Sequence, residues 1–171
     1  MKRLLLFNNQ KLNGLEECIK KISSRLKLNL IINNEFKNEE KSYDYVVVNC
    51  TNINDAIEMT CSYCFINMDN THNKNISIYS NIITYGLGSK NTATVSSVEC
   101  ENLGFVYCLQ RFVNINALGM LTPQEIPICM EFKEESELYA FIICITIALI
   151  EGVSPEKIQM LLGNSKQFVN I

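Results

Sequence analysis

The sequence has no tryptophan, a single histidine (His72) and three prolines, and its longest apolar stretch runs only from residue 138 to 150. A helix that crosses a bilayer needs about 20 apolar residues, so we expect this stretch to be a buried helix and expect no membrane contact. One histidine in a polar segment, without a cysteine pair nearby, gives little basis for a zinc site or a histidine-dependent triad. We therefore expect neither metal nor cofactor.

Charge of neither sign dominates. The 15 Lys and Arg residues against 18 Asp and Glu give a net charge of −3, which offers no electrostatic case for nucleic-acid binding. The first residues, MKRLLLF, are too short an apolar run for a signal peptide, so we expect a cytoplasmic protein. Asparagine and isoleucine are both abundant, a bias typical of AT-rich genomes, which suggests a bacterium of low GC content.

Eight cysteines are present, at positions 18, 50, 61, 64, 100, 108, 129 and 144. The expected compartment argues against disulfides, and most of these residues lie in apolar runs, so we expect buried, reduced thiols that react slowly. Cys61 and Cys64 have the Cys-x-x-Cys spacing of redox sites. We expect both inside a helix, away from the N-terminal end where its dipole would lower a thiol pKa, and we favour a structural role over a thiol enzyme.

The first half of the chain alternates between strand and helix patterns. Apolar runs at 3–8, 28–33 and 45–49 predict buried strands. Strand–helix–strand order with buried strands indicates a parallel sheet. The helix between the first two strands is predicted from apolar residues that recur every three or four positions: Leu12, Leu15, Ile19, Ile22 and Leu26.

A second helix is predicted next, with Asn52 as its cap and with Ile57, Cys61, Phe65 and Met68 on one face. The pattern then changes to short strands at 76–79, 82–85, 92–98, 104–113 and 125–132. A helix over 135–151 and a short last helix starting at Ser154-Pro155-Glu156 complete the chain. We predict one α/β domain, 1–171, with a mainly parallel sheet flanked by helices and a small antiparallel sheet within residues 76–132.

Two glycines in Gly86-Leu87-Gly88-Ser89-Lys90 suggest a phosphate-binding loop. A P-loop has the pattern G-x-x-x-x-G-K-[ST], but here the glycine spacing differs and Asn91 follows Lys90. The next residues, Thr92-Ala93-Thr94-Val95, favour a strand, so no helix N-terminus would face a phosphate. We interpret this segment as a turn and expect neither tight ATP binding nor ATP hydrolysis.

Three segments between residues 43 and 162 share their order and spacing with one known family. Residues 43–49 are similar to that family's strand ending in Asn-x-Asp-Asp, and 82–87 to its strand ending in Thr-Phe/Tyr-Gly. The apolar helix and Glu-Gly-Val-Ser-Pro-Glu turn within 138–162 are similar to the end of its central domain. Together they resemble the ATP-dependent Mur ligases, the peptidoglycan amino-acid ligases.

The residues that the resemblance would assign to ligase chemistry are mostly replaced. Residues 1–42 contain no glycine-rich Gly-Lys-Ser/Thr motif, and after Asn49 the family's acids are replaced by Thr51 and Asn52. The family's His-Asn and further Asn at the long helix correspond to Ser136, Glu137 and Ala140. Only Asn49 carries over, so we do not expect ligase activity.

We therefore expect a non-catalytic relative of the Mur-ligase central domain that works as a protein-interaction or regulatory module, in cell-wall or sporulation regulation. The alternative is a small-molecule, nucleotide-like site at the strand ends, where open α/β sheets bind ligands. Its residues would be Asn49, Thr51, Tyr85, Gly86, Gly88 and Lys90.

A predicted edge strand suggests self-association. Apolar and other residues alternate over 125–132, and Pro127 places this strand at an edge or bulge. The preceding segment, 117–123, is predicted to be an apolar, uncharged loop. Exposed edges of this kind are commonly covered by a partner, so we expect a homo-oligomer, most simply a dimer, and consider an unidentified protein partner as well.

Overall fold

A computed structural model describes residues 1–8, 14–34, 43–50, 57–70, 76–98, 103–115 and 119–163. The predictions that concern Leu12, Thr51, Asn52, His72, Cys100 and Ala117 lie outside these residues. The helices and strands, in chain order, are β1 (Lys2–Phe7), α1 (Leu15–Arg25), β2 (Leu30–Asn33), β3 (Tyr43–Val48), β4 (Ile57–Asn67), β5 (Ile76–Tyr85), β6 (Ala93–Val98), β7 (Phe105–Leu109), β8 (Val113–Ile115), β9 (Gly119–Leu121), β10 (Gln124–Ile128), α2 (Glu135–Ile150) and α3 (Pro155–Leu162).

Eight strands form one mixed sheet in the order β10-β7-β6-β5-β4-β3-β1-β2. The strands from β2 to β5 are all parallel, and β6 joins them through a single parallel pair, Tyr85 with Ala93. The strands β6, β7 and β10 pair antiparallel, and β8 and β9 form a separate two-stranded antiparallel sheet. This architecture confirms the predicted α/β class with a mainly parallel sheet and a small antiparallel one.

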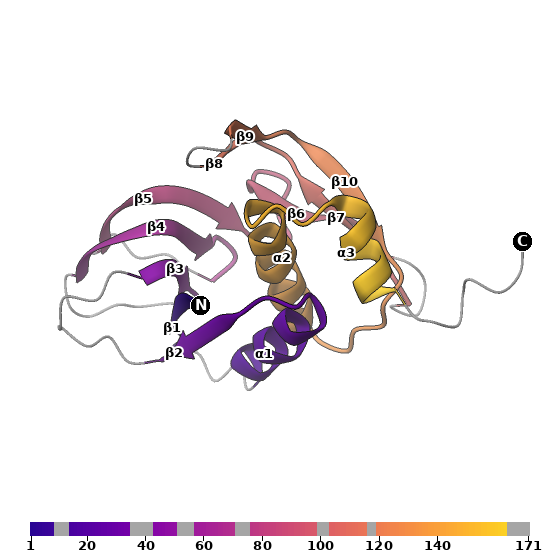
Figure 1. The fold of residues 1–171 in the computed structure, drawn as a ribbon, viewed down its shortest axis with the longest axis horizontal. Coiled ribbons are helices and arrows are strands. Elements are labelled where there is room, and N and C mark those ends of the chain that lie inside the picture. The colour runs from indigo at the N-terminus through magenta and orange to yellow at the C-terminus, as the bar shows by residue number, and fades with distance from the viewer. Residues whose placement is uncertain are drawn as a thin grey trace, which may run out of the picture.

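All three described helices contribute to one core on one face of the sheet, and the strands curve around α2 (Figure 1). The helix α2 is apolar on every side, and nearly all of its residues are buried. Its one buried hydroxyl in mid-helix, that of Thr146, donates to the Ile142 carbonyl at 2.7 Å and lies 2.8 Å from the Tyr107 hydroxyl. No described helix is long and apolar enough to cross a membrane.

The opposite face of the sheet has a second, smaller apolar cluster. Among the described residues, its fully buried members come from β1, β3 and β4 and include Leu5, Val46 and Cys64. Their side chains alternate along each strand with those that face the helices, because successive residues of a strand point to opposite sides. The central strands β1 and β3 are therefore buried on both faces, which matches their apolar runs at 4–7 and 45–48.

The predicted helix around Ile57, Cys61 and Phe65 is wrong, because these residues belong to the strand β4. A spacing of four is a multiple of the two-residue strand period, so it fits a strand as well as a helix. The intervening residues Met59 and Tyr63 are also apolar and buried, which a one-faced helix does not require. β-branched and aromatic residues are frequent in this run, which favours the strand: they are Ile57, Thr60, Tyr63, Phe65 and Ile66.

Several strand boundaries also differ from prediction. Residues 76–85 form one strand, β5, rather than two, and the run 104–113 is divided between β7 and β8. The segment 117–123, predicted to be a loop, contains the short strand β9. The last predicted strand, 125–132, ends at Ile128.

The ends of α2 and α3 follow their predicted signals. Gly152 has a positive φ of 81°, and the Gly152 and Val153 amides donate to the carbonyls of Leu149 and Ala148, the Schellman pattern that ends a helix. The side chain of Ser154 accepts from the Lys157 amide at the start of α3. These caps satisfy backbone groups that the helix ends would otherwise leave unpaired.

Strand β10 lies at one edge of the sheet, where the sequence predicted an edge strand. The carbonyl of Pro127 accepts a hydrogen bond from the Gln159 side chain of α3 at 3.0 Å, so it points away from β7. In a strand, the nitrogen and the carbonyl of one residue point to the same side, so the Pro127 nitrogen also points away from β7. The missing N–H of proline therefore removes no hydrogen bond from the sheet.

Replacing Phe141 by alanine tests the central position of α2. Its ring is almost fully buried and lies 5.1 Å from the ring of Phe105. We expect Phe141→Ala to lower the free energy of unfolding by about 3–5 kcal/mol, measured by urea denaturation followed by circular dichroism. Met160→Ala on the exposed side of α3 is the control and should change it by less than about 0.5 kcal/mol. Equal losses in the free energy of unfolding for the two substitutions would contradict the burial of Phe141 in the core.

Candidate functional site

Amide side chains from three strand ends form a hydrogen-bonded chain at the carboxyl edge of the parallel sheet. Asn49, directly after β3, is fully buried, and its amide nitrogen donates to the Asn8 side chain after β1 at 3.1 Å. The Asn49 side-chain oxygen accepts from Asn67 at 2.8 Å and from Asn70 at 3.1 Å, both at the end of β4. These groups satisfy one another, as buried polar groups must.

The carboxylate of Asp69 connects the end of β4 to the end of β5 and to α2. It accepts a hydrogen bond from the Leu87 amide at 2.6 Å and one from the Tyr139 hydroxyl at 3.1 Å. Burial and the Asp69 charge raise the pKa of Tyr139, so this phenol stays protonated and remains a donor. The Asp69 amide in turn donates to the Asn67 side chain.

Gly86 leaves the space that the Asp69 carboxylate occupies. A Cβ atom at Gly86 would lie 2.7 Å from each carboxylate oxygen, and the φ angle of +150° is one that other residues rarely adopt. Gly88, in the same turn, has no positive φ. The turn is closed by hydrogen bonds from Asn91 to the Gly88 carbonyl and from the Thr92 amide to Thr84.

The structure brings only part of the predicted site together. Asn49 and Tyr85 both adjoin Asn67, the former by its hydrogen bond and the latter as its paired residue across β4 and β5. The Tyr85 ring is buried against Tyr139 and not open at the edge. Gly88 and Lys90 are exposed on the turn, where the Lys90 carbonyl accepts from Arg111.

Sequence reasoning missed Asn67, Asp69 and Tyr139, which hold this edge together. Polar residues directly after an apolar strand are a signal for a carboxyl-edge site. The signal was lost at Asn67 and Asp69 because the preceding run was assigned to a helix. Tyr139 comes from a distant helix, and nothing in its own segment points to Asp69.

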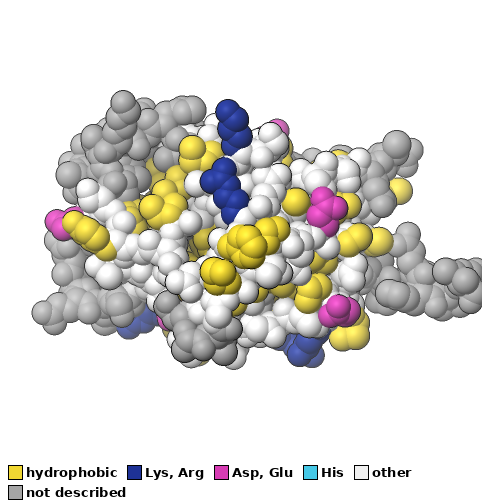
Figure 2. All heavy atoms as spheres, turned by 90° about the horizontal axis from the view of Figure 1, so that it is seen from above, with side chains coloured by type: hydrophobic (Ala, Val, Ile, Leu, Met, Phe, Trp, Pro, Cys, Tyr) yellow, Lys and Arg dark blue, Asp and Glu magenta, His cyan; other side chains and the backbone are white. Residues whose placement is uncertain are grey.

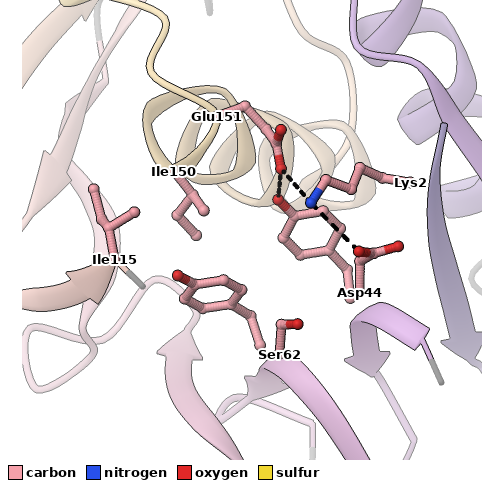
Figure 3. A pocket seen from close by; sticks show the side chains of 8 residues that line it. Lys2, Asp44, Ser62, Ile115, Ile150 and Glu151 are labelled. Atoms are coloured by element: carbon pink, nitrogen blue, oxygen red, sulfur yellow. Dashed lines mark hydrogen bonds and ion pairs between the residues drawn. The ribbon is translucent and has the colours of Figure 1, made fainter. Parts of the chain in front are cut away.

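A second cluster of charges surrounds a cavity of about 200 Å³ near the amino ends of β1 and β3 and the middle of β4 (Figure 3). The Lys2 ammonium lies 3.4 Å from Asp44 and 3.6 Å from Glu151, and the Tyr45 hydroxyl donates to Glu151. Burial, together with this contact, raises the pKa of Tyr45. Burial opposes the charge of Lys2, but the two carboxylates outweigh it and raise the pKa of the ammonium.

This cluster has a structural explanation. Glu151 is the C-cap of α2, directly after its last residue, where the helix dipole disfavours a negative charge, and Lys2 supplies the compensating cation. The charges therefore connect the end of α2 to β1 and β3. Among the described residues, no three His, Cys, Asp or Glu side chains converge as metal ligands.

Replacing Gly86 by alanine tests the close approach of Asp69. Gly86→Ala introduces both an unfavourable φ and the contact with the carboxylate, so we expect a loss of stability of about 2–4 kcal/mol in urea denaturation. Gly119→Ala is the matched control, because Gly119 has a φ of +99° but no atom within 4 Å of the added Cβ. It should cost less, about 1–2 kcal/mol. In an Asp69→Ala background the two costs should become similar; an unchanged difference would contradict the contact.

No protein-family model matches the chain, and no curated protein matches it. Solved structures do match the chain. MurF from Acinetobacter baumannii aligns with 99% of this chain at a TM-score of 0.50 and 10% sequence identity. A UDP-N-acetylmuramoylalanyl-D-glutamyl-2,6-diaminopimelate--D-alanyl-D-alanyl ligase from the same organism aligns with 95% at a TM-score of 0.49 and 10% identity. This chain spans 48% and 45% of those two chains, about half their length. At this identity the likeness concerns the fold alone, which is Mur-ligase-like.

Proposed function

We propose that this chain is a non-catalytic module with a Mur-ligase-like fold that works by binding protein, in the first place a second copy of itself. The observation that carries the proposal is the position of Asp69. Its carboxylate stands against Gly86 at the edge of the sheet where α/β folds of this kind bind ligands.

The groups that would hold a phosphate are already in use or carry the wrong charge. The Leu87 amide, a donor at the start of the turn, is bonded to Asp69. A phosphate oxygen placed 4 Å from that carboxylate would be repelled by about 1 kcal/mol per charge even in bulk water. The chain has no Gly-Lys-Ser/Thr motif that could supply a compensating lysine between β1 and α1.

The β8–β9 hairpin supplies the binding surface in this proposal. Val113 and Leu121 turn toward the core, while Phe112 and Met120 are 61% and 62% exposed. Figure 2 views the side of the molecule that carries this hairpin and shows hydrophobic side chains gathered beside Lys and Arg. A two-stranded sheet is only marginally stable by itself, so covering its outer face would stabilise it.

A second copy is the occupant that we favour for this surface. Phe112 and Met120 carry no charge themselves, the chain's net charge is only −3, and symmetric dimers are the commonest oligomers. The likeness to MurF makes cell-wall synthesis the process in which we propose that the module acts, by analogy of fold alone.

A small-molecule site at the carboxyl edge is the second candidate. The Tyr85 hydroxyl is fully buried near Asn67, and among the described residues it makes no hydrogen bond of normal geometry. A buried hydroxyl without a partner is costly, and a ligand atom would satisfy it. The site would lie beside Asn49, Tyr85 and Gly86.

The first test is calorimetry with ATP and magnesium. We expect no binding tighter than about 1 mM, which corresponds to about −4 kcal/mol, because Asp69 and its partners occupy the phosphate position. A micromolar dissociation constant that Lys90→Ala abolishes and Lys157→Ala leaves unchanged would overturn the proposal in favour of a nucleotide site. Both lysines are exposed, so the pair controls for the loss of one surface charge.

The second test is light scattering during size-exclusion chromatography at micromolar concentration. We expect a mass of about twice 19.5 kDa for the unmodified chain, and the monomer mass for Phe112→Ser combined with Met120→Ser, since the apolar contact is removed. Met160→Ser, which changes an equally exposed methionine on α3, should remain dimeric. A monomeric unmodified chain, or a dimer insensitive to the hairpin substitutions, would show that the hairpin is not a self-association surface.

A further inference from the structure

Strand β2 forms the second edge of the eight-stranded sheet, and its outer side pairs with no described strand (Figure 1). On its inner side Lys2 of β1 lies opposite Leu30, and the Lys2 amide donates to the Asn29 carbonyl at 2.9 Å. Successive residues of a strand direct their backbone groups to alternate sides, so Asn29 faces β1 while Leu30 and Ile32 face outward. The Leu30 amide donates to the Leu28 carbonyl. The Leu30 carbonyl and both backbone groups of Ile32 therefore have no partner among the described residues.

An open groove of about 500 Å³ lies between this edge and the end of α1. We call it the β2 groove. Its apolar side chains are those of Leu28, Leu30 and Ile32, which are partly buried against the core. Their spacing of two residues is that of an extended chain, so they share the face of the sheet that carries α1. The charged side chains that line the groove are Lys20 and Lys27, and both are basic.

Lys27 has a backbone conformation that is unfavourable for a residue with a Cβ atom. Its φ of 57° is left-handed, alone among the described residues other than glycine. It follows the C-cap of α1, where its amide donates to the Ser24 carbonyl and where glycine is the usual residue. The lysine side chain is thus present where glycine would be more stable. Among the described residues no carboxylate forms an ion pair with Lys27, whereas Lys20 is paired with Glu16.

We propose that the β2 groove binds an extended, acidic segment of a partner protein, which adds to the sheet as a strand beside β2. The open backbone groups of Leu30 and Ile32 bond to the backbone of this segment. The groove holds its apolar side chains, and its carboxylates pair with Lys20 and Lys27.

A second copy of this chain fits the β2 groove less well. The strand at the far edge of its sheet, β10, contains a proline that cannot donate a hydrogen bond, and the outward carbonyl of Pro127 already accepts from Gln159. The charge of the groove favours instead a different chain that carries carboxylates. The β2 groove lies apart from the β8–β9 hairpin, so this proposal and the self-association proposed above can fail independently (Figure 1).

The test is a nitrogen-15 NMR titration of the full chain with the peptide Thr-Glu-Thr-Ile-Thr-Glu-Thr-Thr, which places Glu, Ile and Glu on one face of a strand. We expect a dissociation constant below about 1 mM, and no binding in that range when both Glu are replaced by Lys. Lys27→Glu should weaken binding by about fivefold or more. Lys157→Glu, a charge reversal at an exposed lysine of α3, is the control and should leave binding unchanged. The proposal is overturned if the lysine peptide binds as tightly as the acidic one.

Two further peptides separate strand pairing from simple charge attraction, and both are used with the unsubstituted chain. Only every second amide of an added strand points to β2, so the acidic peptide is N-methylated either at its odd or at its even positions. We expect one of these peptides to lose binding and the other to keep it. If both bind as tightly as the unmethylated peptide, the contact is through charge alone and the proposal is overturned.

Lys27→Gly separates binding from folding. The urea midpoint of unfolding should stay the same or rise, because glycine adopts a positive φ without strain. The dissociation constant of the acidic peptide should rise by about threefold or more, because the groove loses a positive charge. Unchanged binding of the acidic peptide to this variant would overturn the proposal.

Discussion

The structure depends on the burial of one helix. Nearly every side chain of α2 is apolar and buried, so the helix must be surrounded on all sides and cannot lie on the surface of a flat sheet. The sheet curves around it, α1 packs beside it, and α3 follows on the same side after a tight turn. This requirement explains why the described helices share one face of the sheet and why the antiparallel strands continue the parallel ones as a single curved layer.

The carboxyl edge is built from contacts between this helix and the strand ends. Asp69 reaches Tyr139 of α2 and the Leu87 amide of the turn after β5, while Asn49 and Asn67 join the neighbouring strands. In many α/β folds polar groups at this edge face a ligand. Here they bond largely to each other, which is why we propose that the molecule binds protein and not nucleotides.

A single inserted residue changes the chemistry available on the other face. Strand β4 has a bulge, because Thr60 pairs with Tyr79 of β5 whereas Tyr63 pairs with Asn81; without it Cys61 and Cys64 would lie on opposite sides of the sheet. With it, both belong to the second apolar cluster, where Cys61 borders a cavity and Cys64 is fully buried. Bulges often direct a side chain to a new position in this way.

Much of the fold followed from local sequence signals. The apolar runs of β1 and β3, the amphipathic spacing of α1, the proline at the sheet edge and the Gly152 and Ser154 caps each act over a few residues, so each could be interpreted without knowing its neighbours. The run 57–67 could not, since its spacing of four suits a helix and a strand equally and only pairing with β3 and β5 selects the strand. For the same reason the site was predicted in part: Asn49, Tyr85 and Gly86 mark strand ends, but Asp69 and Tyr139 acquire their partners from residues distant in sequence.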